Sequence, residues 1–288
     1  MKILVVGANG QLGKKLQDWA KQFPTSYNFL FTDVDILDIC DKRAVEKTIQ
    51  EHQIEIIINC VAYTAVDNAE KEQDISEKLN GNAVGILANL SAQYDVFFVH
   101  ISTDYVFDGQ HYKPYTEVDN LAPISVYGRT KLLGEKLFIK SKCKGVIIRT
   151  SWLYSEYGNN FLKTMLRLGK EKKQINVVCD QVGTPTYAGD LANVIMTILA
   201  QKNVVQHQEI YHYSNEGVIS WYDFSKTIME ISSSNCSVKP ILAKNYPTLA
   251  QRPYYSVLDK SKIKSDFNIE IPYWKESLYN CMQIIENQ

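Results

Sequence analysis

Short apolar runs alternate with longer amphipathic stretches along the first half of the chain. The runs lack polar alternation, which is typical of parallel strands buried on both faces of a sheet. The predicted strands cover residues 3–6, 28–32, 55–59, 96–101 and 145–149, and the predicted helices cover residues 11–21, 42–52, 76–93 and 126–140. This regular strand-then-helix order predicts an α/β fold with a doubly wound parallel sheet, the Rossmann fold.

The strand-then-helix rhythm breaks down after Arg149, where aromatic residues and prolines crowd the chain. Two further strand-and-helix pairs can still be identified in the second half. The first pairs residues 175–179 with 189–200, and the second pairs residues 209–213 with 221–231. The second half is therefore expected to be less regular than the first.

The chain length favours one main domain with a smaller second region, because 288 residues exceed the usual size of a single domain. We expect a dinucleotide-binding Rossmann domain over residues 1–150, to which residues 175–214 add late strands and a helix. Residues 151–174 and 215–288 are expected to form a smaller C-terminal substrate-binding region. No internal repeat or low-complexity tract suggests a different organisation.

Composition narrows the class of protein. The net charge is −1 with 31 basic and 32 acidic residues, so nothing points to nucleic acid or to a membrane surface. The 6 cysteines are scattered without a C-x-x-C pair, which favours a reducing compartment. No apolar run approaches the roughly 18 residues of a membrane helix, and the first run is too short for a signal peptide. We therefore expect a cytoplasmic protein.

Three glycines follow the first predicted strand directly. Gly7, Gly10 and Gly13 form a G-x-x-G-x-x-G pattern at the start of a predicted helix. Glycines allow the tight turn and let backbone N–H groups approach a pyrophosphate, whose charge is favoured at a helix N-terminus. A glycine triplet alone is a weak signal, but its place after an uninterrupted strand indicates a dinucleotide site.

Asp33 lies at the end of the second predicted strand, 20 residues after Gly13. An acidic side chain at this position can accept hydrogen bonds from the adenosine ribose and would favour NADH, because a 2′-phosphate would meet like charge. Asp33 also lies in an acid-rich stretch, so an ordinary solvated turn is an equal alternative. The sequence leaves the choice between NADH and NADPH open.

Tyr127 and Lys131 are four residues apart in a predicted helix and would project from neighbouring turns. A phenol is a weak acid with a pKa near 10, and a nearby ammonium group lowers that pKa by stabilising the phenolate. Thr103 follows another strand at the same edge of the predicted sheet, where its hydroxyl could bind a substrate carbonyl. Together these residues predict a reductase in which Tyr127 protonates a ketone.

With these residues in place, the chain resembles the extended short-chain dehydrogenase/reductase family, and within it the branch of dTDP-4-dehydrorhamnose reductases. The matching segments run nearly end to end. They are GANGQLG from Gly7, LDICD from Leu37, NCVAYTAVDNAE from Asn59, HISTDYVFDG from His100, PISVYGRTKLLGE from Pro123, RTSWLY from Arg149, DQVGTPT from Asp180 and RPYYSVLD from Arg252.

The resemblance implies a role for each matching position. The implied cofactor contacts are Gly10, Gln11 and Leu12 at the pyrophosphate, Asp38 and Ile39 at the adenine, and Ala62, Tyr63 and Thr64 at the ribose and nicotinamide, in addition to Tyr127 and Lys131. The implied catalytic set is Thr103, Tyr127 and Lys131, and the implied substrate contacts are Thr103, Asp104, Tyr105 and Trp152. The implied reaction is NADH- or NADPH-dependent reduction of the C4 ketone of a dTDP-linked 4-keto-6-deoxyhexose, a step in polysaccharide precursor synthesis.

The chain departs from the family pattern at two places. Cys60 and Val61 replace alanines after the third strand, and these changes are small. Some relatives bind magnesium at a dimer contact through a glutamate early in the first helix, where this chain has Lys14 and Lys15. We therefore expect no metal, while a homodimer remains possible.

Other members of such a family could carry out a different activity from this reduction. A nucleotide-sugar 4,6-dehydratase needs a second carboxylate beside Asp104, and this chain has Tyr105 there. Another 4-ketoreductase or an epimerase would use the same tyrosine and lysine. A non-catalytic regulatory subunit that binds dinucleotide is the remaining alternative, because such relatives can retain catalytic residues.

Overall fold

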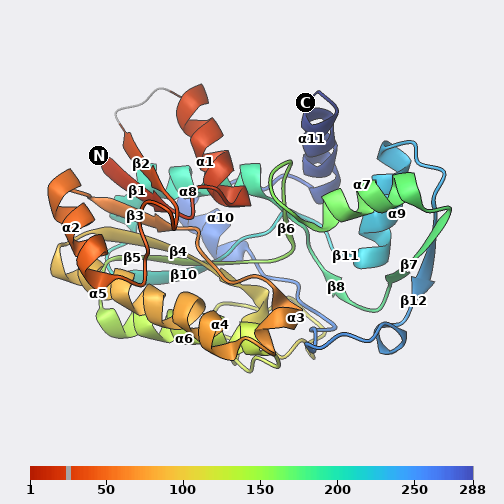
Figure 1. The fold of residues 1–288 in the computed structure, drawn as a ribbon, viewed down its shortest axis with the longest axis horizontal. Helices are drawn as coiled ribbons and strands as arrows, with labels where there is room; N and C mark the ends of the chain where they lie inside the picture. The colour runs from red at the N-terminus through yellow and green to blue at the C-terminus, as the bar shows by residue number, and fades with distance from the viewer. Residues whose placement is uncertain (24–26, 288) are drawn as a thin grey trace.

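The computed structural model describes residues 1–23 and 27–287 (Figure 1). Its centre is a parallel sheet with the strand order β10-β5-β4-β3-β1-β2. The strands are β1 (Lys2–Val6), β2 (Asn28–Thr32), β3 (Ile56–Asn59), β4 (Phe97–Thr103), β5 (Gly145–Thr150) and β10 (Gln208–His212). The α/β fold with a central parallel sheet is confirmed. From β1 the chain adds β2 on one side of the sheet and then crosses to add β3 on the other side. The carboxyl ends of the strands at such a switch point form a ligand crevice.

Helices cover both faces of this sheet (Figure 1). Alternating residues of β1 explain why both faces are apolar, since Ile3 and Val5 enter one core and Leu4 and Val6 the other. The first core includes side chains from α1 (Gln11–Gln22), α8 (Ala188–Ala200) and α10 (Ser261–Phe267). The second includes side chains from α2 (Lys42–His52), α5 (Ala83–Gln93) and α6 (Val126–Ser141). Each buried aliphatic side chain contributes about 1.5–3 kcal/mol of transfer free energy.

The helix predicted over residues 76–93 is interrupted. It consists of α4 (Gln73–Glu77), a π-helical turn η1 (Lys78–Asn82) and α5, and a short helix α3 (Val66–Ala69) precedes it. The π turn lies where α6 packs closely, because a Cβ on Gly134 would come within 2.2 Å of the Asn80 carbonyl oxygen. The Asn80 side chain also accepts a hydrogen bond from the Tyr63 backbone at 2.8 Å. Such contacts cannot be deduced from hydrophobic periodicity.

The segment 175–214 is divided between two parts of the structure. We expected it to add strands and a helix to the main sheet. Strand β10 lies beside β5, and α8 packs against α1. Strand β7 (Gln174–Val178) instead pairs in parallel with β12 (Ser237–Ile241), whose sequence lies far along the chain. An apolar run does not reveal its partner when the pairing is non-local, which explains this difference.

The second lobe surrounds the β7–β12 pair and lies to the right in Figure 1. Its apolar core is formed mainly by α7 (Phe161–Glu171), α9 (Trp221–Ile231) and α11 (Trp274–Glu286). The short pairs β6 (Leu153–Tyr154) with β9 (Thr186–Tyr187), and β8 (Val182–Gly183) with β11 (Ile219–Ser220), connect it to the main domain. The remaining elements are the 3-10 turns η2 (Asp104–Val106), η3 (Lys202–Val204) and η4 (Ala243–Asn245).

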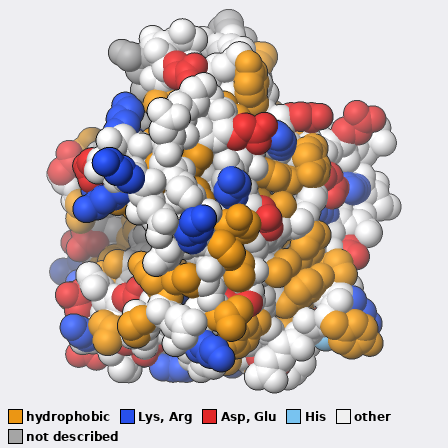
Figure 2. Space-filling view, turned by 90° about the vertical axis from the view of Figure 1, so that its right-hand side faces the viewer, with side chains coloured by type: hydrophobic (Ala, Val, Ile, Leu, Met, Phe, Trp, Pro, Cys, Tyr) orange, Lys and Arg blue, Asp and Glu red, His pale blue; other side chains and the backbone are white. Residues whose placement is uncertain are grey.

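The outer face of this lobe combines scattered charges with apolar side chains (Figure 2). Tyr273, Tyr279 and Ile284 are exposed on or next to α11. Within the described residues, no helix combines the length and the apolar character needed to cross a bilayer.

Candidate active site

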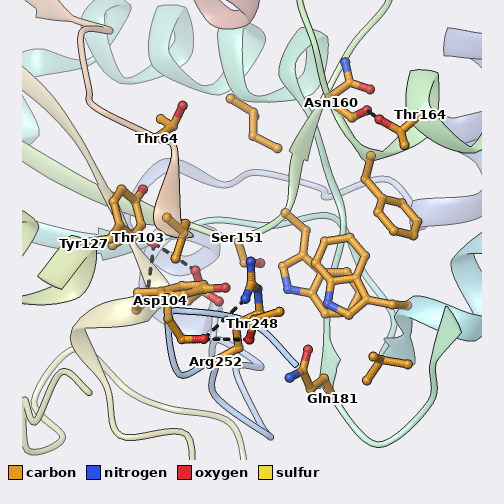
Figure 3. Close-up of a pocket in the computed structure, with 18 of the residues that line it drawn as sticks. Thr64, Thr103, Asp104, Tyr127, Ser151, Asn160, Thr164, Gln181, Thr248 and Arg252 are labelled. Atoms are coloured by element: carbon orange, nitrogen blue, oxygen red, sulfur yellow. Dashed lines mark hydrogen bonds between the residues drawn. The ribbon is translucent and has the colours of Figure 1, made fainter. Parts of the chain in front are cut away.

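A cavity of about 1170 Å³ lies between the carboxyl ends of the main-sheet strands and the second lobe. Its wall includes residues that the sequence analysis expected at the dinucleotide cofactor and at the sugar substrate. Those that line it are Gly10, Gln11, Leu12, Ala62, Thr64, Thr103, Asp104, Tyr105, Tyr127, Lys131 and Trp152. Figure 3 shows Thr64, Thr103, Asp104 and Tyr127 on one side of this space. The fold therefore gathers segments that are far apart in the sequence.

The glycine loop forms one end of the cavity. Gly7 has φ +77°, and a Cβ on Gly13 would come within 2.4 Å of the Gly7 carbonyl oxygen, so both positions require glycine. Gly10 caps α1 without a side-chain hydrogen bond, which leaves the helix N-terminus available to an anion. Gly7 and Gly13 lie behind the cavity wall and shape the loop, so the glycine pattern fits the pyrophosphate of a dinucleotide.

Gln11 joins this loop to the second lobe. Its side-chain oxygen accepts hydrogen bonds from the Asn160 amide at 2.9 Å and from the Ser155 hydroxyl at 3.1 Å. Asn160 is labelled in Figure 3 near the far side of the cavity. Hydrogen bonds therefore tie the glycine loop to the second lobe.

Three other expected cofactor residues, Asp33, Asp38 and Ile39, are not among the residues that line the cavity. Asp33 accepts a hydrogen bond from the Asn9 backbone at 2.8 Å, and the residue that follows it, Val34, is exposed. Asp38 accepts a hydrogen bond from the Cys40 backbone at 2.9 Å, whereas the Ile39 side chain is buried in the core. The Asp33 carboxylate thus holds the backbone of the loop that follows β1.

Tyr63 differs from its two neighbours. Ala62 and Thr64 line the cavity, whereas the Tyr63 hydroxyl donates a hydrogen bond to Glu72. The Tyr63 backbone is held by Asn80. Its side chain therefore fixes the turn, and a cofactor contact from this segment would come from Ala62 and Thr64.

The N-terminus of α6 places Tyr127 in the cavity. Ser125 caps the helix by accepting a hydrogen bond from the Gly128 backbone at 3.1 Å. Burial raises the pKa of Tyr127 to about 12, and a hydrogen bond with Thr103 opposes the shift. Tyr127 therefore remains protonated at neutral pH in this state and is available as a proton donor.

Lys131 lies one turn further along α6 and is almost fully buried. Its ammonium group donates a hydrogen bond to the Ile101 carbonyl at 2.6 Å. Burial lowers the pKa of Lys131 to about 8, while the charge of Glu135 acts in the opposite direction. Lys131 and Tyr127 both line the cavity, and a cation close to a phenol favours the phenolate form.

Thr103 and Asp104 stand at the end of β4. The Thr103 hydroxyl donates to the Asp104 carboxylate at 3.0 Å and accepts from the Tyr105 backbone at 3.2 Å (Figure 3). The rings of Tyr105 and Tyr127 meet edge to face with centroids 5.4 Å apart. Burial raises the pKa of Asp104 to about 6, although hydrogen bonds oppose the shift.

A buried ion pair lies beneath these residues, and the sequence analysis missed it. Arg149 donates to Glu135 through Nε at 2.9 Å and through Nη2 at 2.7 Å. Ser102 donates to the same carboxylate at 2.5 Å. Glu135 lies four residues after Lys131, so the helical spacing could have revealed that it shares a helix face with Tyr127 and Lys131.

Trp152 lies in the wall with an unusual backbone, at φ +47°. Its ring stacks on Trp221 with centroids 3.5 Å apart and an interplanar angle of 11°. Trp221 begins α9 and also lines the cavity, but its distance from Trp152 in the sequence hid this pairing. The two rings offer an apolar surface to a ligand.

A second ion pair holds the loop that closes this side of the cavity. Arg252 donates to Asp67 through Nη1 at 3.2 Å and Nη2 at 2.6 Å, and the Ala250 backbone donates to the same carboxylate at 3.0 Å. Both arginine and loop residues line the cavity, as Figure 3 shows for Arg252 and Thr248. The sequence segments containing Asp67 and Arg252 were noticed, but their contact was not.

The first helix carries Lys14 and Lys15 at the positions that the sequence analysis considered for a metal ligand. Lys15 forms an ion pair with the buried Glu156 at 2.7 Å. Among the described residues, no cluster of three or more histidine, cysteine or acidic side chains is arranged to hold a metal ion.

Comparison with known proteins gives a consistent family. Residues 1–287 match the family described as RmlD substrate binding domain. The dTDP-4-dehydrorhamnose reductase of Aggregatibacter actinomycetemcomitans is 41% identical over 296 residues, which cover 99% of both chains.

Two solved structures have nearly the same fold. A dTDP-4-dehydrorhamnose reductase from Clostridium acetobutylicum superposes with a TM-score of 0.94 and 40% identity, over 99% of this chain and 100% of the other. The Bacillus anthracis dTDP-4-dehydrorhamnose reductase in complex with NADP superposes with a TM-score of 0.92 and 39% identity, over 98% and 99% of the two chains.

Proposed function

The chain belongs to the RmlD substrate binding domain family, and on this premise we propose that it is a dTDP-4-dehydrorhamnose reductase. It reduces the C4 ketone of dTDP-4-dehydro-6-deoxy-L-mannose to dTDP-L-rhamnose with NADH or NADPH. The observation that carries this function is the meeting of Thr103, Tyr127 and Lys131 in one cavity with the glycine loop. The family resemblance found in the sequence is confirmed by the full-length relatives.

The glycine loop and Asp33 would hold the dinucleotide, which supplies the hydride when bound. Gly13 leaves no Cβ in the turn, and the uncapped N-terminus of α1 faces the cavity through Gln11 and Leu12. Ala62 and Thr64 form the adjoining wall. These residues orient the ligand, and orientation supplies much of the acceleration in such reactions.

Tyr127 performs the proton step. Its phenol donates a proton to the C4 oxygen of the sugar, and Lys131 stabilises the phenolate that remains. Thr103 lies beside the tyrosine at the end of β4 and helps to fix its hydroxyl. Asp104, Tyr105 and Trp152 are proposed to face the sugar, because all three line the same cavity.

The second lobe is proposed to form the substrate-binding region, from residues 151–174 and 215–288. Its support is that the stacked Trp152 and Trp221 and the loop ending at Arg252 line the cavity opposite Tyr127. The enzyme is further proposed to work in the cytoplasm and to form a homodimer. The homodimer should need no magnesium, because the Lys15 ammonium group already pairs with the Glu156 carboxylate. Light scattering should give the mass of two chains both with and without EDTA, and a chelator-dependent mass would contradict this proposal.

The activity is tested by supplying dTDP-4-keto-6-deoxy-L-mannose with NADH or NADPH. We expect stoichiometric loss of the reduced nicotinamide absorbance and dTDP-L-rhamnose as the product by NMR. An epimerase would change the sugar without net consumption of the cofactor. A regulatory subunit would consume none with this or other 4-keto nucleotide sugars, and either result would overturn the assignment.

A further inference from the structure

The first helix presents a polar face to the second lobe. Gln11, Lys15 and Asp18 recur at helical spacing, so their side chains lie on the same face of α1. All three contact the short segment of residues 155–160, which leads from β6 into α7. The contacts are Gln11 with Ser155 and Asn160, Lys15 with Glu156 at 2.7 Å, and Asp18 with the Tyr157 hydroxyl at 2.9 Å. Polar side chains therefore join the helix that begins at the glycine loop to the second lobe.

The ion pair between Lys15 and Glu156 lies at the centre of this face and is largely buried. The two side chains are 12% and 1% exposed. The Glu156 carboxylate also accepts a hydrogen bond from the Tyr187 hydroxyl at 3.3 Å and lies 3.8 Å from the Cys281 sulfur of α11. The carboxylate thus belongs to the packed interior of the second lobe, whereas the ammonium group is carried by a helix of the main domain.

The contacts of this helix face connect two walls of the cavity. Gln11 lines the cavity at the N-terminus of α1. On the side of the second lobe, Asn160 caps α7, and Thr164 in the first turn of that helix lines the cavity next to it (Figure 3). Neither Lys15 nor Glu156 is among the residues that line the cavity. The ion pair can therefore act on both walls without contacting a ligand there.

A buried ion pair is better suited to positioning than to net stability. Desolvation of the two charges offsets most of their attraction, so such a pair adds little to the free energy of unfolding. It nevertheless restricts the two segments, because separating the charges would leave the Glu156 carboxylate buried without its cation. The chain itself restricts them less, since only the two-residue strand β6 stands between β5 and α7. The pair therefore sets how α1 and residues 155–160 lie relative to each other.

We propose that Lys15 and Glu156 are positioning residues that couple the binding of the dinucleotide to the binding of the nucleotide sugar, an inference that rests on the proposed reductase activity. A dinucleotide at the glycine loop fixes Gln11 and the first turn of α1. The ion pair transmits this restriction to residues 155–160 and to the start of α7. The nucleotide sugar then meets a wall that is already ordered, so its binding loses less conformational entropy. The coupling is reciprocal, because each ligand must change the affinity for the other by the same factor.

Isothermal titration calorimetry with dTDP measures this coupling, because dTDP has no ketone and cannot be reduced. The second ligand is NADH or NADPH, whichever wild type binds more tightly. In wild type, dTDP should bind at least roughly 5-fold more tightly when this dinucleotide is present. In Lys15→Met, each ligand alone should bind within about twofold of wild type, but the effect of the dinucleotide on dTDP should fall below about twofold. Lys15→Arg keeps the positive charge and should retain the coupling.

Two further variants separate positioning from general stability. The control Lys262→Met removes an ion pair with Glu209, also 2.7 Å long, which joins α10 to β10 within the main domain. It should leave the coupling at its wild-type value. Tyr157→Phe removes only the hydrogen bond to Asp18 on the same face of α1 and should lower the coupling in part. Circular dichroism shows whether each variant is folded.

The outcomes distinguish the failure of this proposal from the failure of the reductase assignment. Equal affinity for dTDP with and without the dinucleotide in wild type, or wild-type coupling in Lys15→Met, would overturn the positioning role and leave the reductase assignment intact. An equal loss of coupling in Lys262→Met would also overturn it, because general destabilisation would then explain the result. If Lys15→Met does not fold, wild-type coupling in Tyr157→Phe decides against the proposal. Wild type that binds neither the dinucleotide nor dTDP would instead refute the reductase assignment, and this inference with it.

Discussion

The buried pair of Glu135 and Arg149 should be indispensable to stability unless both members are removed together. Their side chains are 1% and 0% exposed and form two short hydrogen bonds. The substitution Glu135→Gln keeps the shape and one acceptor but removes the negative charge. Arg149 then remains buried without a counter-charge, because its other polar contacts are the Glu117 carbonyl and His212.

The expected cost follows from this burial. Removing one partner of a buried pair costs about 3–5 kcal/mol, whereas replacing both by apolar residues of similar volume can be close to neutral. Glu135→Gln should therefore lower the free energy of unfolding by about 3–5 kcal/mol. The double variant Glu135→Leu with Arg149→Met should recover most of the loss, because no unpaired charge remains.

Urea denaturation followed by tryptophan fluorescence measures both effects. The control is Arg167→Gln, which removes the exposed pair with Glu171 and should change stability by under about 1 kcal/mol. A loss of less than about 1 kcal/mol in Glu135→Gln would refute the argument that Arg149 is then buried without a counter-charge. Equal losses in the single and double variants would show that packing, and not the unpaired charge, explains the effect.

Three further results are expected from the site. Gly13→Ala should abolish dinucleotide binding in a fluorescence titration while the protein stays folded, because the new Cβ would meet the Gly7 carbonyl oxygen at 2.4 Å; binding within threefold of wild type would contradict this. Asp33→Asn should raise kcat/KM for NADPH relative to NADH, since a like charge is removed from the position expected for a 2′-phosphate; an unchanged ratio would reject that position for the ribose. The turnover rate should fall as the pH rises through about 8, because Lys131 loses the charge that supports the phenolate; in Glu135→Gln this fall should begin at lower pH, since Glu135 raises the pKa of Lys131.

The periodic half of the chain was predictable because its signals are local. The apolar runs that became β1, β3, β4 and β5 are buried on both faces, whereas the edge strand β2 is mostly half-buried. The helix boundaries of α2 and α6 follow from their Asp41 and Ser125 caps. The glycine loop and the Tyr127–Lys131 spacing are equally local. Short-range spacing within one strand or one helix was sufficient for these features.

The features that were missed depend on contacts between distant segments. The π turn at Asn80 forms because α6 packs against it, and β7 pairs with β12 because the second lobe closes around them. Trp152 reaches Trp221, and Arg252 reaches Asp67, only after both lobes are assembled. No spacing rule within a single element could indicate these partners.

The most direct test of the account is a comparison of Tyr127→Phe with wild type, under single-turnover conditions with dTDP-4-keto-6-deoxy-L-mannose. The variant should bind NADH with nearly wild-type affinity but reduce the ketone at least roughly 10²-fold more slowly, because the phenol that donates the proton is missing. Wild-type turnover by Tyr127→Phe, with binding intact, would contradict the central claim that Tyr127 protonates the sugar oxygen.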